Sequence, residues 1–135
     1  MPVQLPESVR AFLEEVHFAT IATANRDGSV HQTALWYALR GDTIVMNTGT
    51  ASKKVRNLKR DPRASVCVVD CTQARHVTIE GSVSFDDQHV LEDLTLLASR
   101  YAGASAGPGI AQNIAKVPHV TLALSIDRIK TFGKL

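Results

Sequence analysis

Short strand-like segments joined by tight turns constrain the fold of this chain more than any other feature. Runs rich in Thr, Ile, Val and Ala fill 18–24, 29–39 and 43–47, and the turns between them are Asn25-Arg26-Asp27-Gly28 and Arg40-Gly41-Asp42. An Asp-Gly pair between two strand-like runs is a strong hairpin signal. The sequence therefore predicts a three-stranded antiparallel meander in its first third.

Further strands follow in the rest of the chain. The apolar run 64–70 predicts a buried strand, and 75–85 alternates with a candidate bulge at Gly81. A last strand is expected over 120–126 and can extend through 128–132. Short strands with tight turns and few helices argue for a small antiparallel barrel. With 135 residues, 44% of them hydrophobic, we expect a single domain over 1–135.

Helical periodicity appears on both sides of the central strands. The segment 6–16 predicts an amphipathic helix whose buried face is Val9, Phe12, Leu13 and Val16. A second helix is expected from an Asp86 cap to Tyr101, with a buried face of Val90, Leu91, Leu94, Leu97 and Ala98. The Gly-rich stretch 103–109 is predicted to be the most mobile loop, and a short helix is expected at 110–116.

Positive charge is concentrated in one segment after the third strand. Between Thr50 and Arg63 a single acid, Asp61, is set against six basic residues, which are Lys53, Lys54, Arg56, Lys59, Arg60 and Arg63. The whole chain carries only +2, so the remainder is mildly acidic. Such a local concentration indicates a particular negatively charged partner rather than a generally adhesive surface.

The same segment has the pattern of a strand end followed by a helix. The helix opens after Thr48, Gly49, Thr50 and Ser52 and should stop at Asp61-Pro62, because the residue before proline disfavours helical angles. A helix N-terminus offers unpaired amides and a partial positive charge, which suits a phosphate. The P-loop pattern is missing. The alternative is a solvated basic helix face with a Thr or Ser cap.

Two tracts together resemble a known superfamily. They are Thr-Gly-Thr-Ala-Ser-Lys-Lys-Val-Arg-Asn-Leu-Lys-Arg-Asp-Pro-Arg-Ala-Ser-Val at 48–66 and Arg-His-Val-Thr-Ile-Glu-Gly-Ser-Val at 75–83. In this order, after a hairpin and a strand, they resemble the pyridoxamine 5'-phosphate oxidase-like superfamily, and more narrowly its deazaflavin (coenzyme F420) dependent reductases. The resemblance covers 18–132, and Ser52 to Arg63 is its most diagnostic part.

The resemblance implies a mainly β fold with a few helices, a split β-barrel of the FMN-binding type. It also implies a homodimer with two equivalent cofactor sites in grooves between the subunits. The cofactor would be F420 or FMN, each with a phosphate beside a ribityl chain and a tricyclic ring. Such a cofactor supplies the hydride chemistry, and the protein positions it.

Carried onto this chain, the resemblance assigns the cofactor contacts to two groups of residues. Those along the phosphate and tail are Thr48, Gly49, Thr50, Ser52, Lys53, Lys54, Arg56 and Arg60, with Lys54 foremost. Those along the ring edge are Gln32, Thr33 and Ala34. Arg60 and Arg63 could reach the tail or bridge a surface acid such as Asp61. Ala34 and Leu35 depart from the Pro-Val-Trp that the family often has here.

The balance of charge favours F420 over FMN, because F420 has the longer and more anionic tail. We expect an F420-dependent oxidoreductase that transfers a hydride to a small unsaturated or quinone-like acceptor. The alternatives are an FMN-binding oxidoreductase of the same fold and a non-catalytic F420- or flavin-binding protein. Pyridoxine phosphate oxidation is not expected, since the chain ends at Leu135 without a C-terminal Arg and His cluster. Nucleic-acid binding is disfavoured because no stacking aromatics are interleaved with the basic residues.

The remaining polar and aromatic residues give weaker signals. His76 is the candidate donor to substrate or ring, with a structural role as the alternative. The five histidines lack ligand spacing, so no metal site is expected, and Cys67 and Cys71 are taken as structural, with Cys67 in the core. Of the neighbours Trp36 and Tyr37, one should face inward, and we assign Trp36 to the core.

The N-terminal sequence has neither a basic region with an apolar signal core nor any run of roughly 20 apolar residues. We therefore expect a cytoplasmic protein without a membrane partner.

Overall fold

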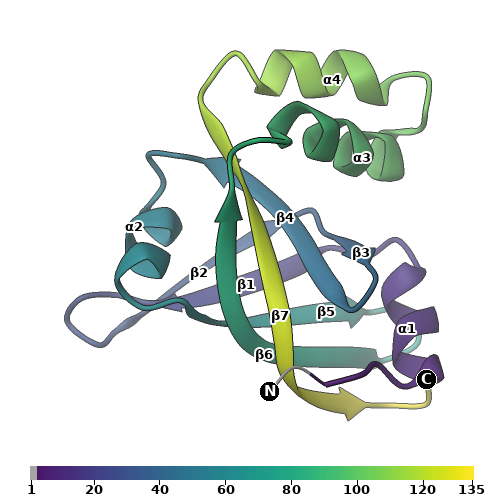
Figure 1. Cartoon of the computed structure of the whole chain (residues 1–135). Coiled ribbons are helices and arrows are strands. Elements are labelled where there is room, and N and C mark those ends of the chain that lie inside the picture. The colour runs from purple at the N-terminus through teal and green to yellow at the C-terminus, as the bar shows by residue number, and fades with distance from the viewer. Residues whose placement is uncertain (1–2) are drawn as a thin grey trace.

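The structure, a computed structural model, describes residues 3–135 and contains one antiparallel sheet of seven strands in the order β2-β1-β5-β6-β7-β4-β3. Its two edge strands, β2 (Val30–Leu35) and β3 (Ala38–Arg40), are consecutive in the chain and separated by two residues. A sheet whose opposite edges are joined so closely must curl round on itself. The result is the split β-barrel in the middle of Figure 1, which confirms the predicted fold class.

The other strands lie close to where the sequence predicts them. They are β1 (Ala19–Ala24), β4 (Thr43–Gly49), β5 (Arg63–Asp70), β6 (Arg75–Asp86) and β7 (His119–Phe132). The predicted bulge is also confirmed, because the register of β6 against β7 shifts between Glu80 and Gly81.

The predicted meander is wrong in one respect. The single strand expected over 29–39 breaks at Trp36 and Tyr37, so that β2 pairs with β1 while β3 pairs with β4. The physical reason is Tyr37, whose fully buried side chain donates a hydrogen bond of 2.8 Å from its hydroxyl to the carbonyl of Leu13. That anchor diverts the chain from one edge of the sheet to the other.

Alternate residues of the strands fill the barrel, and two helices cover its ends. Helix α1 (Glu7–Glu14), at the lower right of Figure 1, buries Val9, Phe12 and Leu13. Helix α2 (Lys53–Arg60), at the left, buries Val55 and Leu58. The assignment of Val16 to the buried face was wrong, since α1 ends before it and Val16 is exposed.

Helices α3 (Val90–Ala102) and α4 (Gly107–Ile114) form a hairpin at the top of Figure 1, against β4 and β7. A small second core of Leu94, Ala98 and Ala111 joins the two helices. Of the predicted buried face of α3, Leu94, Leu97 and Ala98 are confirmed, Val90 is half-buried, and Leu91 is wrong because it points to solvent.

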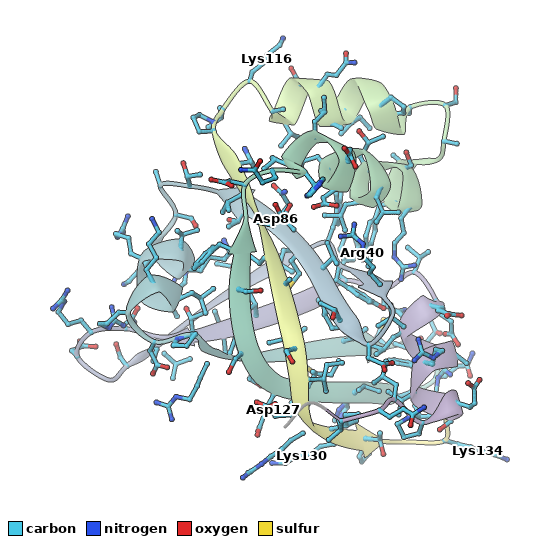
Figure 2. The ribbon with its side chains drawn as sticks, in the orientation of Figure 1. Arg40, Asp86, Lys116, Asp127, Lys130 and Lys134 are labelled. Atoms are coloured by element: carbon cyan, nitrogen blue, oxygen red, sulfur yellow. The ribbon has the colours of Figure 1, made fainter. Side chains whose placement is uncertain are left out.

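Two predicted boundaries in this region are also wrong. Asp86 does not cap α3, which begins four residues later. Instead its carboxylate accepts from the Gln88 amide at 2.7 Å and contacts His89 Nδ1 at 2.9 Å, at the end of β6 (Figure 2). The predicted loop 103–109 is shorter than expected, because residues 107–109 form the first turn of α4.

Of the helices among residues 3–135, none combines the length and the apolar character that a membrane crossing requires.

Candidate cofactor site

The link between β4 and α2 forms what we call the anion cradle, which consists of Thr48, Gly49, Thr50, Ser52, Lys53 and Lys54. Ser52 has extended backbone angles and caps α2, its hydroxyl accepting from the Val55 amide at 3.4 Å. The Ser52 amide in turn donates to the Gly49 carbonyl at 3.1 Å. Since the first amides of a helix have no intrahelical acceptor, those of Lys53 and Lys54 are placed to bind an anion.

Lys54 reaches back into this cradle. Its Nζ donates a hydrogen bond of 2.9 Å to the hydroxyl of Thr48, a residue with only 7% of its surface exposed. Burial lowers the pKa of Lys54 below its ordinary value, because a low-dielectric surrounding disfavours the charged form. Among residues 3–135, this ammonium group binds a hydroxyl, and no carboxylate pairs with it. A half-buried cation of this kind favours an anionic ligand.

The other basic residues of α2 divide into two sets. Lys53, Arg56 and Lys59 are exposed, and Arg56 folds back onto the Ala51 carbonyl at 2.8 Å. Arg60 lies at the far end of the helix, where its guanidinium donates to the carbonyl of Ala24. Arg63 pairs with Asp61 at 2.8 Å, which is the surface bridge considered as its alternative role.

Asn57 holds α2 against the barrel, although the sequence did not single it out. It is buried, and its Nδ2 donates to the hydroxyl of Thr23 at 3.1 Å and to Oδ1 of Asn25 at 3.0 Å. These bonds tie the helix to β1 and to the hairpin that follows it. The available signal was an uncharged amide next to the buried position Leu58 in an otherwise basic helix.

The three predicted ring-edge residues do not share one face. Gln32 and Ala34 are exposed on the outer side of β2, whereas Thr33 points to the opposite side with a buried hydroxyl that has no hydrogen-bond partner. Only Gln32 and Ala34 can therefore present side chains to one ligand from that face.

A second feature, which we call the aromatic cavity, is an open hollow of about 360 Å³ between β2, β4, the start of β7 and the α3–α4 hairpin. Its apolar walls include Phe18, Trp36, Leu94, Leu97 and Ile114. The Trp36 ring stacks on that of Tyr101 at 5.1 Å with 9° between the planes, and Tyr101 also stacks on Phe18 at 5.4 Å. The assignment of Trp36 to the core was wrong: Tyr37 occupies the core, and Trp36 forms a wall of the cavity.

The anion cradle and the aromatic cavity are connected through the paired backbones of β4 and β7, although no cradle residue lines the cavity. Asn47 lines the cavity and directly precedes Thr48 of the cradle. Gly49 pairs with His119, a second polar residue of the cavity, and the Thr50 amide donates to the Pro118 carbonyl at 3.0 Å. Neither Asn47 nor His119 was predicted as a site residue, because only the pairing of β4 with β7 brings them together.

His76 and the cysteines lie elsewhere. The His76 ring stacks on Phe132 at 4.9 Å, and its buried Nδ1 has no hydrogen-bond partner. Within this chain it touches neither the cradle nor the cavity. Both cysteines are free, and Cys67 is half-buried on the outer face of β5, so its assignment to the core was wrong.

A larger hollow of about 480 Å³ lies on the outer face of the sheet. Small residues such as Ala22, Ala24 and Ser65 line it, together with Glu80 and Arg128. It contains no residue of the cradle.

One group of side chains has the composition of a metal site. Glu15, His17 and Asp70 each offer one ligand atom, and these atoms lie within 4.8 Å of one another. The guanidinium of Arg75, however, binds Glu15 at 2.8 Å and Asp70 at 2.5 Å. One cation already pairs with both carboxylates, so the group is an ion-pair network of the fold.

Comparison with known proteins places these features in a family. The family model described as pyridoxamine 5'-phosphate oxidase matches residues 5–133. A conserved hypothetical protein from Mycobacterium tuberculosis is similar in structure, with a TM-score of 0.80, 27% identity, and coverage of 98% of this chain and 86% of that one.

Two further structures share the fold at lower identity. An F420 reductase has a TM-score of 0.80 and 23% identity, with 93% of this chain and 98% of that chain covered. A pyridoxamine 5'-phosphate oxidase-related, FMN-binding protein from Nostoc punctiforme has a TM-score of 0.65 and 18% identity, with coverage of 87% and 74%.

Proposed function

Since this chain belongs to the pyridoxamine 5'-phosphate oxidase family, we propose that it is an oxidoreductase that binds coenzyme F420 through the anion cradle. The observation that carries the proposal is Lys54, a half-buried ammonium group bonded to a threonine hydroxyl rather than to a carboxylate. The whole chain would act as one cofactor-binding domain.

The donor set of the cradle fits a phosphate. It combines the ammonium group of Lys54, the hydroxyls of Thr48, Thr50 and Ser52, and the free amides at the start of α2. When bound in its reduced form, F420 would supply a hydride from C5. The residues of this chain would hold its phosphate, orient its ring along Gln32 and Ala34, and exclude water from the adjoining aromatic cavity.

Charge supports F420 rather than FMN. Lys53 of the cradle and Lys59 beyond it are exposed on α2 and could meet a long anionic tail, and Arg56 is also exposed, although its guanidinium donates to the Ala51 carbonyl. FMN ends at its phosphate and would leave these charges without a ligand. Arg60 and Arg63 contribute less in this proposal, because the Ala24 carbonyl and Asp61 occupy their guanidinium groups. The similarity of fold to an F420 reductase is consistent with the choice.

We further propose that the protein acts as a homodimer. The outer face of the sheet carries small residues together with exposed Val69 and Phe132, which suits contact with a second copy. In such a dimer His76 of one protomer would face the cofactor groove of its partner. Sedimentation at micromolar concentration tests this part, and a monomer would contradict it.

Equilibrium dialysis against F420 and, separately, against FMN tests the choice of cofactor. The proposal expects F420 to be retained at least tenfold more tightly, about 1.4 kcal/mol. Equal or tighter retention of FMN would move the protein to the flavin branch of the family. Retention of neither would overturn the proposal.

A further inference from the structure

Helix α4 is attached to the rest of the molecule mainly through α3. In Figure 1, α3 lies between α4 and the strands, and the contacts of α4 are concentrated on that helix. The buried residues of α4 are Gly107 and Ala111, and Ala111 packs with Leu94 and Ala98 of α3. Among residues 3–135, no side chain of α4 forms a hydrogen bond or an ion pair with another element. The attachment of α4 is therefore small and apolar.

Helix α3, in contrast, is held at both ends by polar contacts. Near its start, the Asp93 carboxylate accepts from the Thr121 hydroxyl at 2.7 Å. At its other end, Arg100 donates to the carbonyls of Leu13 at 3.0 Å and Glu15 at 2.7 Å. Since α4 makes no comparable bond within the described part of the chain, α3 can keep its place when α4 moves.

The sequence of α4 also makes a weak helix. Two of its eight residues are Gly107 and Gly109, and glycine is among the least favourable residues in a helix. Pro108 suits the first turn, but no side chain caps the N-terminus, where Ala106 is the N-cap residue. Helices shorter than about 12 residues are marginal on their own in water, so α4 depends on its contact with α3.

The segment that carries α4 has a hinge on one side and a fixed point on the other. Gly103 ends α3 with a φ of 94°, which residues with side chains rarely adopt, and a Cβ there would meet nothing within 4 Å. On the other side, the Pro118 carbonyl accepts from the Thr50 amide at 3.0 Å, which fastens the chain to the end of β4. Residues 104–117 can therefore change position while α3 and β7 stay where they are.

We propose that α4 is a movable wall of the aromatic cavity, which detaches from α3 by local unfolding between Gly103 and Pro118 while α3 and the barrel keep their places. Ile114 of α4 lines the cavity, and Trp36, another wall residue, packs against the same small core as α4. Detachment widens the hollow of about 360 Å³ and uncovers Trp36, so that a ligand larger than the docked hollow can enter and leave. The inference goes beyond the proposed function and does not depend on which cofactor the cradle binds.

Amide hydrogen exchange followed by mass spectrometry tests the inference on the wild-type protein without cofactor. Under conditions in which exchange reports the population of the open state, peptides from α4 should exchange at least about tenfold faster than peptides from the second half of α3. Comparable protection of the two helices would overturn the inference, because α4 would then open only together with α3.

Two variants that each add one methyl group to α4 sharpen the test. At Gly107 the added Cβ would lie 2.2 Å from Ser99 Oγ and 2.6 Å from Ser99 Cα, so Gly107→Ala pushes α4 away from α3. The exchange of α4 should rise about fivefold or more, and acrylamide should quench Trp36, the single tryptophan of the chain, more efficiently.

Gly109→Ala is the matched variant. A Cβ at Gly109 meets nothing within 4 Å, so the alanine strengthens the docked helix and should slow the exchange of α4 by about 2- to 5-fold. The exchange of α3 should change in neither variant.

An equal response of α4 exchange to the two substitutions would overturn the inference, as would unchanged quenching of Trp36 in Gly107→Ala. Loss of the whole fold in Gly107→Ala, seen by circular dichroism, would also overturn it, because a movable wall can leave without unfolding the barrel. Titration with F420 decides the proposed function separately. F420 binding with α4 as protected as α3 would overturn this inference alone, and the expected exchange pattern without F420 binding would overturn the cofactor proposal alone.

Discussion

Asp93 on α3 accepts a hydrogen bond of 2.7 Å from the hydroxyl of Thr121 on β7. Its other oxygen lies 2.5 Å from a guanidinium nitrogen of Arg40, which Figure 2 shows between β3 and α3. The Asp93 carboxylate is 2% exposed, so these partners must replace the water that it loses. These two bonds attach α3, which forms part of the wall of the aromatic cavity, to the strands of the barrel.

Thr121→Val should lower the free energy of unfolding by about 1–3 kcal/mol, because it leaves a buried carboxylate oxygen without its donor. Urea unfolding followed by circular dichroism measures the change. Thr131→Val, at an exposed position of the same strand, is the control and should change stability by less than about 0.5 kcal/mol. An equal effect of the two substitutions would contradict this account of the α3 attachment.

Asn57→Ala should destabilise the protein by about 1–3 kcal/mol, since it removes the donor to Thr23 and Asn25 from a buried position. The control is Lys59→Ala, on the exposed face of the same helix, which should hardly change the stability. Thermal unfolding of both proteins makes the comparison. A stable Asn57→Ala protein would show that α2 does not depend on this link.

Gly81 and Gly109 should respond to alanine in opposite directions. A Cβ at Gly81 would lie 1.8 Å from the Ser125 carbonyl oxygen, inside the bulge, so Gly81→Ala should cost about 3 kcal/mol or more. A Cβ at Gly109 meets nothing within 4 Å, and in helix α4 Gly109→Ala should gain up to about 0.5–1 kcal/mol. Chemical denaturation of the two variants tests the difference in sign.

Ionised Asp70 should stabilise the folded protein at neutral pH and lose this effect in acid. Hydrogen bonds from Thr72 and then from Arg75 hold the pKa of Asp70 well below its usual range. In the unfolded chain an aspartate has a pKa of about 3.9. Because the pKa of Asp70 is lower in the folded protein, ionised Asp70 stabilises the fold at neutral pH. This contribution is lost as the pH falls from about 4 through the folded pKa. The stability difference between wild type and Asp70→Asn should be largest near neutral pH and should shrink in acid. Asp87→Asn, at an exposed loop position, is the control.

Local signals in the sequence were enough to predict helix α2 and most strands, whereas anion binding by the cradle stays a prediction. Ser52 caps α2 and Pro62 follows its end, so both boundaries of that helix are determined by nearby residues. The same holds for the hairpin at Asp27-Gly28, where glycine supplies a φ of 88°.

The errors arose where distant residues decide the structure. The alternating pattern of 29–39 continues through Trp36, and only the hydrogen bonds of Tyr37 to Leu13 and of Tyr101 to the Tyr37 backbone show that the chain turns there. The aromatic cavity was likewise beyond prediction, because His119, Trp36 and Leu97 meet only after α3 and α4 fold over the barrel.

Titration of F420 into wild-type protein, Lys54→Ala and Lys134→Ala is the most direct test of the central claim, that the cradle binds the cofactor phosphate. Lys134 is exposed near the C-terminus and provides a matched loss of charge away from the cradle (Figure 2). The account predicts that Lys54→Ala weakens binding by about 10- to 100-fold, or roughly 1.5–3 kcal/mol, and that Lys134→Ala binds as wild type does. Unchanged affinity in Lys54→Ala would contradict the account and remove the cradle as the phosphate site.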